Sequence, residues 1–215
     1  MVRASHPGSS IPRAFEENAA VLVSLQNRHT ELLHRENPSI SDSLTGLERL
    51  VVEQHLTNFE LWHAEDSARA PEASDHELAR IKRFIDQTNQ RRNDLAEQCD
   101  ALLLDILSPQ GLPAPEAELH SESPGLMIDR LSILSLKLFH TREEMERPGA
   151  PQGHAEANRA RFLVLAEQRQ DLAAALGCLW RQILERKRRF KIYRQLKMYN
   201  DPALNPALYR RRPSP

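Results

Sequence analysis

The stretch that decides the fold is residues 124–146, PGLMIDRLSILSLKLFHTREEME. Apolar residues recur along it so closely that, in an α-helix, they surround the axis on nearly every side. These positions are Leu126, Met127, Ile128, Leu131, Ile133, Leu134, Leu136, Leu138 and Phe139. A surface helix would keep one wide polar face, so this pattern predicts a helix that its neighbours cover nearly all round. Ser123 and Pro124 precede it as an N-cap and a first-turn proline.

The rest of the chain supplies helices that could cover it. Apolar residues at helical spacing predict helices over residues 15–36, 43–70, 74–107 and 154–199, and the last of these could break near Arg189. Ser74 and Glu77 form a capping box at the start of the third helix. A Pro-rich linker, residues 108–123, joins the third helix to the fourth. We therefore expect an all-α fold, a single bundle of five or six mostly up-and-down helices.

Three segments follow from this pattern. Residues 1–13 carry Pro, Gly and Ser and are expected to form a flexible lead, residues 14–200 the helical bundle, and residues 201–215 a basic, Pro-containing tail. No stretch within the first twenty residues has the apolar length of a signal peptide, and no stretch of about 18 uncharged apolar residues occurs that could form a transmembrane segment. The expected location is the cytoplasm.

Composition excludes several classes of protein. The chain has 215 residues, of which 40% are hydrophobic, 5% aromatic and only 7 are glycine. This profile argues against general disorder, a β-sandwich or barrel, and a Gly-loop nucleotide fold. The two cysteines, Cys99 and Cys178, have no second cysteine at ligand spacing, which argues against a disulfide framework and a Cys-based zinc site.

The charge is unevenly distributed. From Trp180 to the end there are eleven Lys and Arg residues and two acids, a charge of +9, which leaves −10 for the remainder. Within this part, residues 186–197 interleave basic and aromatic side chains; we call them the basic segment. Such a segment could make a peripheral contact with anionic lipid or follow a nucleic-acid backbone, and it could equally fold back on the acidic body. The acidic body makes nucleic-acid binding the less favoured of these.

Polar residues on the second and third helices need an explanation. His63 and Asp66 lie about 60° apart on one helix, so they could supply two ligands of a divalent metal, with a neighbouring helix supplying the others. An ordinary ion pair or polar core is the alternative. On the third helix, Asp86 and Asn93 share one face. Asn89 lies next to this face, and Arg92 belongs to the same polar run, residues 89–94. That face could be simply solvated, or its amides could contact a ligand.

The fourth helix contains four polar residues among its apolar ones. Asp129, Arg130, Lys137 and His140 fall within an arc of about 100°. Buried ions without partners are costly, so these must pair with each other, with the polar face of the third helix, or with a ligand. One hypothesis is a buried structural network. The other is a pocket in which Arg130 and Lys137 bind an anion while Asp129 or His140 transfers a proton.

Four segments together resemble a known family. They are residues 61–69 (LWHAEDSAR), 82–94 (KRFIDQTNQRRND), 123–134 (SPGLMIDRLSIL) and 193–202 (YRQLKMYNDP). With these segments the chain resembles a bacterial family recorded only as domain of unknown function 4254. The resemblance implies that the polar residues just described matter, and it implies an association with glycosyltransferases and cell-surface polysaccharide metabolism.

Two functional hypotheses result. In the first, the bundle binds or acts on an anionic small molecule, phosphorylated or sugar-linked, with a divalent metal as an optional cofactor. Its catalytic candidates are His63, Asp66 and Asp129, and its binding candidates are Asp86, Asn89, Arg92, Asn93, Arg130, Lys137 and His140. In the second, the chain is a non-catalytic adaptor for a glycosyltransferase-type partner or a membrane, which it contacts through the basic segment. Convergence of the candidates on one cavity would favour the first hypothesis.

Overall fold

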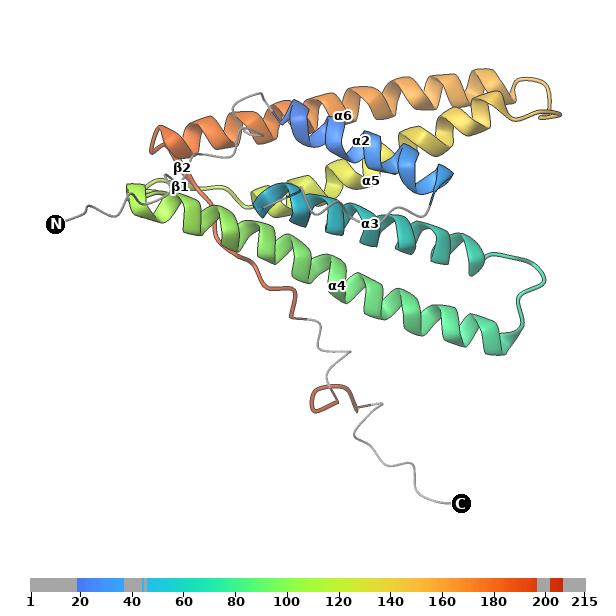
Figure 1. Ribbon diagram of the computed structural model, residues 1–215, viewed down its shortest axis with the longest axis horizontal. Coiled ribbons are helices and arrows are strands. Elements are labelled where there is room, and N and C mark those ends of the chain that lie inside the picture. The colour runs from blue at the N-terminus through green and yellow to red at the C-terminus, as the bar shows by residue number, and fades with distance from the viewer. Residues whose placement is uncertain (1–18, 37–43, 45, 197–201, 207–215) are drawn as a thin grey trace, which may run out of the picture.

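A computed structural model of the chain describes residues 19–36, 44, 46–196 and 202–206. Within these residues the structure consists of α-helices, one 3-10 turn and two very short strands (Figure 1). The elements are α2 (Ala20–Arg35), α3 (Gly46–Ser67), α4 (Asp75–Leu107), η1 (Ser108–Gln110), β1 (Glu118–Leu119), α5 (Pro124–Glu146), α6 (His154–Leu184) and β2 (Arg188–Arg189). The expected all-α bundle is therefore confirmed.

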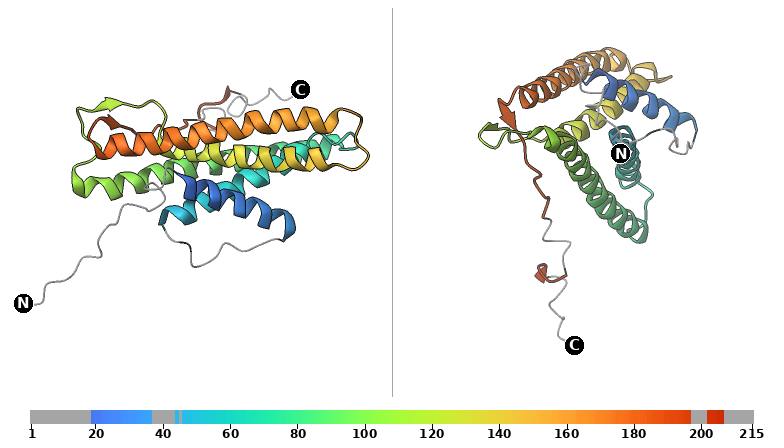
Figure 2. Two further views of the ribbon diagram at one scale, coloured as in Figure 1. Left: turned by 90° about the horizontal axis from the view of Figure 1, so that it is seen from above. Right: turned by 60° about the vertical axis from the view of Figure 1, so that its left-hand side comes forward.

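Helix α5 lies at the centre of the bundle. It packs against α2, α3, α4 and α6, which confirms that neighbouring helices cover it on several sides (Figures 1 and 2). Successive long helices run antiparallel, α3 with α4 and α5 with α6, and α2 packs on both α3 and α5. The core between them is formed by apolar residues of every helix, among them Leu22, Val51, Leu103, Ile128, Leu131, Leu176 and Trp180.

The start of α5 is held tightly against α4. The carboxylate of Asp100 accepts a hydrogen bond from the backbone N–H of Gly125 at 2.7 Å and another from the hydroxyl of Ser123, the N-cap residue. A Cβ atom at Gly125 would lie 2.2 Å from the backbone carbonyl oxygen of Ala96. Only glycine allows the two helices to approach this closely. The Ser-Pro-Gly sequence at residues 123–125 thus has a packing role.

The last helix ends earlier than the sequence predicts. It stops at Leu184, five residues before the alternative break near Arg189 and well before residue 199, because Arg186 adopts a left-handed backbone conformation (φ 62°). The chain then pairs Arg188 and Arg189 in parallel with Glu118 and Leu119, two residues inside the Pro-rich linker. Residues 190–196 contain no helix, and the backbone N–H of Gln195 donates to the carboxylate of Glu97 on α4 at 3.0 Å.

Other sequence expectations differ less. The helix predicted over residues 43–70 spans Gly46–Ser67, and α4 and α5 agree with their predicted ranges within one residue. Residues 15–18 of the first predicted helix and the whole lead, residues 1–13, lie outside the described residues, as does most of the tail from residue 201 onward. Among the described residues, no helix is both long and apolar enough to cross a membrane.

Candidate metal centre

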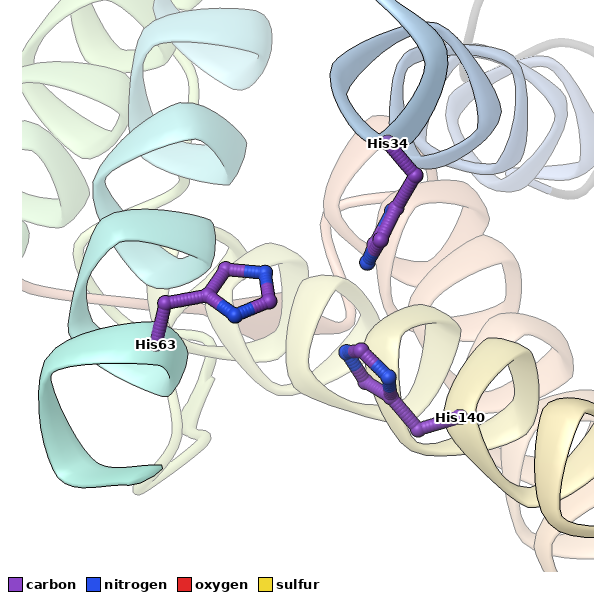
Figure 3. Close-up of side chains that lie close together, drawn as sticks. All are labelled: His34, His63 and His140. Atoms are coloured by element: carbon purple, nitrogen blue, oxygen red, sulfur yellow. The ribbon is translucent and has the colours of Figure 1, made fainter. Parts of the chain in front are cut away.

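Three histidines from three helices meet at one point. His34 lies in the last turn of α2, His63 near the end of α3 and His140 in the second half of α5. One ring nitrogen from each lies within 4.8 Å of the others. Figure 3 shows the three rings arranged around a shared space, with nitrogen atoms directed into it. The sequence pointed to His63 and His140 separately, but it did not pair them and it did not single out His34.

The inner nitrogens of this cluster have no hydrogen-bond partner. The Nε2 atoms of His34, His63 and His140 are all buried and all unpartnered. A buried polar atom without a partner costs about 1–3 kcal/mol, so such atoms are rare in folded proteins. Three of them in one cluster therefore point to a group that binds there.

The outer nitrogens determine which tautomer two of the rings adopt. Nδ1 of His34 lies 2.7 Å from the backbone carbonyl oxygen of Thr30, and Nδ1 of His140 lies 2.8 Å from the carboxylate of Glu143. Because both of these oxygens can only accept, Nδ1 must carry the proton, which leaves a lone pair on Nε2. Metal-binding histidines are typically oriented by such a bond from their other ring nitrogen to a carbonyl or carboxylate.

Aromatic side chains fix the orientation of the rings. Phe139 stacks on His34 with 3.9 Å between ring centroids, and Trp62 stacks on His140 at 4.7 Å with the planes only 9° apart. Phe59 contacts the rings of both His34 and His63 edge-on. Burial, and then the neighbouring histidines, lower the pKa of His63, although Asp66 and Glu143 oppose the shift. The neutral imidazole is the form that binds a metal.

The distances suit a metal ion after a small closure. Zinc–nitrogen bonds of about 2.0–2.1 Å place the nitrogens of a tetrahedral site about 3.4 Å apart. The nitrogen atoms of the three rings lie within 4.8 Å of one another, so each nitrogen–nitrogen distance would have to shorten by about 1.4 Å at most. Rotation of the side chains can supply this change. Asp66 is exposed and is not part of the three-residue cluster. The described residues thus offer three nitrogen ligands and leave a fourth position open.

The predicted catalytic residue Asp129 belongs to a different cluster. Its carboxylate pairs with the guanidinium of Arg92, with 2.6 Å between Arg92 Nη2 and Asp129 Oδ2. Asn58 donates a further hydrogen bond to it at 2.9 Å. Two candidates from separate helices, Asp129 of α5 and Arg92 of α4, are thus brought together.

A buried hydrogen-bond chain connects this ion pair to the histidine cluster. Asn58 donates to Ser132, whose hydroxyl lies 2.8 Å from Nδ1 of His55. Nε2 of His55 lies 2.9 Å from the hydroxyl of Thr30, which donates its own proton to the carbonyl of Gln26. The hydroxyl of Thr30 must therefore accept a hydrogen bond from Nε2 of His55. The hydroxyl of Ser132 must then donate a hydrogen bond to Nδ1 of His55. Burial is the main cause that lowers the pKa of His55 to about 3, so this ring is neutral.

The remaining candidates lie elsewhere. Arg130 forms an ion pair with Glu122, with nitrogen–oxygen distances of 2.7 and 2.8 Å, and Asp86 pairs with Lys82 on the exposed side of α4. Asn89 and Asn93 are partly buried on α4. Lys137 lines two cavities between α5 and α6. The ten candidates therefore fall into several groups. His63 meets His140 in the histidine cluster, and Arg92 pairs with Asp129. Lys137 shares one cavity with Arg130 and another with His140.

The comparisons with known proteins identify a family. The family described as "Protein of unknown function (DUF4254)" matches residues 48–192, about two thirds of the chain, and the chain therefore belongs to it. The resemblance seen in the sequence is confirmed. No match was found among the curated proteins or among the solved structures. His63 and His140 lie inside the matched range, whereas His34 precedes it.

Proposed function

We propose that this member of the DUF4254 family binds a divalent transition-metal ion, zinc by preference, through His34, His63 and His140. The open fourth position would then bind a small molecule. The observation that carries this proposal is the set of three buried Nε2 atoms without partners, contributed by three different helices to one point. A purely structural polar cluster would be expected to pair such atoms with each other or with neighbouring donors.

The ligand set favours zinc over calcium, magnesium and iron. Three neutral imidazoles suit zinc, copper, iron or nickel, whereas calcium and magnesium require oxygen ligands. The usual non-haem iron site combines two histidines with a carboxylate, and no carboxylate belongs to the cluster among the described residues. Three protein ligands with an open position are typical of catalytic zinc, whereas structural zinc is enclosed by four.

The chemistry available at such a centre is that of a Lewis acid. A zinc ion with an open position polarises a carbonyl or phosphoryl oxygen of a bound molecule. The protein's own residues hold the rings in place: the Thr30 carbonyl orients His34, and Glu143 orients His140. Glu143 is exposed and contacts His140, so it is also a candidate for moving a proton.

Metal content tests the proposal directly. Protein dialysed against zinc and then freed of excess is expected to retain one zinc per chain by elemental analysis. Replacing His34, His63 or His140 with alanine should remove it, because two imidazoles alone hold zinc weakly. The matched control is His76→Ala, an exposed histidine on α4 outside the cluster. Equal zinc content in wild type and His63→Ala, with both proteins folded by circular dichroism, would refute the proposal.

A second candidate function is the adaptor role. One observation favours it: within the basic segment, Tyr193 and Leu196 are 42% and 82% exposed, although apolar surface of this kind is usually covered. An adaptor would bind a glycosyltransferase-type partner or an anionic membrane through this segment. Truncation after Lys191, which removes Tyr193 and Leu196, should then weaken binding to anionic vesicles or to that partner while leaving the bundle folded. Unchanged binding of the truncated chain to both would exclude this role.

A further inference from the structure

A cavity opens beside His140, one member of the histidine cluster. It has a volume of about 380 Å³ and lies between α5 and α6, with His140 and Trp62 in its wall. Lys137 and His140 are one helical turn apart on α5, and Arg161 faces them from α6. The volume falls within the range of about 300–1,000 Å³ that is usual for small-molecule sites.

The charges around this cavity are not balanced. Lys137 and Arg161 are its two cationic side chains, and Glu144 is its one acid. Glu144 is already engaged, because its carboxylate lies 2.8 Å from Nε2 of His154 and 3.4 Å from Nε of Arg147. Arg161 donates to the neutral amide of Asn158, and Lys137 has no acidic partner among the described residues. Two positive charges therefore face the cavity without an anion to neutralise them.

We propose that this cavity binds the phosphate group of a small phosphorylated molecule. The proposal rests on the metal centre of the proposed function, because the ion held by His140 and its two partners would contact one phosphate oxygen. Lys137 and Arg161 would contact the others. A phosphate monoester offers a double negative charge and three oxygens, which matches one divalent ion and two cationic side chains better than a carboxylate does.

The surroundings indicate where the organic part of the ligand lies. Lys137 also lines a second, larger cavity of about 720 Å³ that continues between α5 and α6. The apolar side chains of Leu134 and Leu172 form part of its wall. Arg130, at the same cavity, is neutralised by Glu122, so this part of the groove carries less positive charge. The phosphate is thus assigned to the end near His140 and the remainder of the molecule to the wider end.

Calorimetric titration with three related probes tests the assignment. Phenyl phosphate, benzoate and phenol share a ring and differ in the charged group. Phenyl phosphate is expected to bind zinc-loaded protein more tightly than benzoate, and phenol to give no measurable heat. Lys137→Gln and Arg161→Gln should each weaken phenyl phosphate binding by about tenfold or more, since each removes a charge-assisted hydrogen bond. Lys82→Gln, an exposed lysine on α4, is the matched control.

Repeating the titration without metal separates the two proposals. If the chain binds no zinc, but phenyl phosphate still binds in a manner that depends on Lys137 and Arg161, the metal centre is refuted and the anion site stands. If one zinc binds and millimolar phenyl phosphate does not, the anion site is refuted and the metal centre stands. Equal affinity of the wild type, Lys137→Gln and Arg161→Gln for phenyl phosphate, or tighter binding of benzoate, also refutes the anion site.

Discussion

The buried carboxylate of Asp100 should make the protein more stable as the pH falls below neutrality. Burial raises the pKa of this group from 3.8 to about 6, although hydrogen bonds from Ser123 and Gly125 oppose the shift. The folded state therefore binds the proton more tightly than the unfolded state does. The contribution of this group to the free energy of unfolding is fully present below its pKa in the unfolded state. It is lost as the pH rises through its pKa in the folded state.

The size of the effect follows from the two pKa values. A difference of about two units corresponds to about 3 kcal/mol in total, since one unit is about 1.4 kcal/mol. Between pH 7.5 and pH 4.5 the contribution of Asp100 should amount to about 2 kcal/mol, because pH 4.5 still lies above the unfolded pKa of 3.8 and the rest of the gain comes below it. Histidines such as His55 and His63 change stability in the opposite direction at low pH, since their pKa values are lowered in the folded state.

The variant Asp100→Asn separates these contributions. Asparagine keeps the shape and can still accept the hydrogen bond of Gly125, but it cannot titrate. The assay is urea unfolding followed by circular dichroism at a series of pH values, for both proteins. The free energy of unfolding of the wild type minus that of the variant should increase by about 2 kcal/mol as the pH falls from 7.5 to 4.5. A difference that stays constant, or that shrinks as the pH falls, would refute the reasoning.

Three further predictions concern packing, metal binding and the ion pair. Gly125→Ala should lower the free energy of unfolding by about 2 kcal/mol or more in urea titrations, because its Cβ would overlap the Ala96 carbonyl; a loss below about 0.5 kcal/mol would contradict the close approach. Cobalt bound at the proposed centre should quench the fluorescence of Trp62, which stacks on His140. The variant Trp62→Phe should no longer show this quenching. Quenching that survives in Trp62→Phe would place the ion elsewhere. Replacing Arg92 with methionine should destabilise the fold by about 2 kcal/mol at pH 7, because it leaves the nearly buried carboxylate of Asp129 unpaired; the same unfolding assay should show no loss from Arg91→Met, a neighbouring exposed arginine.

Much of the fold could be predicted because local signals mark the helix ends. A capping box begins α4, and Ser123 with a first-turn proline begins α5, so both helices start where expected. The end of α6 carries no such signal. Its basic residues are compatible with a longer helix, and what ends it is a left-handed turn at Arg186 and pairing with residues 118–119. That pairing depends on residues about seventy positions apart, which periodicity does not show.

The candidate site was predictable only in part, for a similar reason. Helical spacing identified His63 and His140 as polar residues that needed partners, but spacing cannot rotate or place one helix relative to another. His34 is part of no motif and simply lies in the last turn of a short helix. The pairing of Arg92 with Asp129 was not predicted, because Arg92 was expected to bind a ligand. His55 and Asn58 share a helix face with the apolar residues Leu47 and Val51, but they were missed because polar residues were not counted toward the buried face.

Helix α2 completes the site, and specific contacts hold it there. Gln26 donates to the backbone carbonyl of Ile128 on α5 at 3.0 Å, and Thr30 accepts from His55 on α3. The same Thr30 orients His34 through its carbonyl oxygen, so a single turn of α2 both docks the helix and aims the ligand. The family match begins at residue 48, after this helix. Two of the three proposed metal ligands, His63 and His140, therefore come from the matched part of the chain, and the position of the third, His34, depends on how α2 packs against that part.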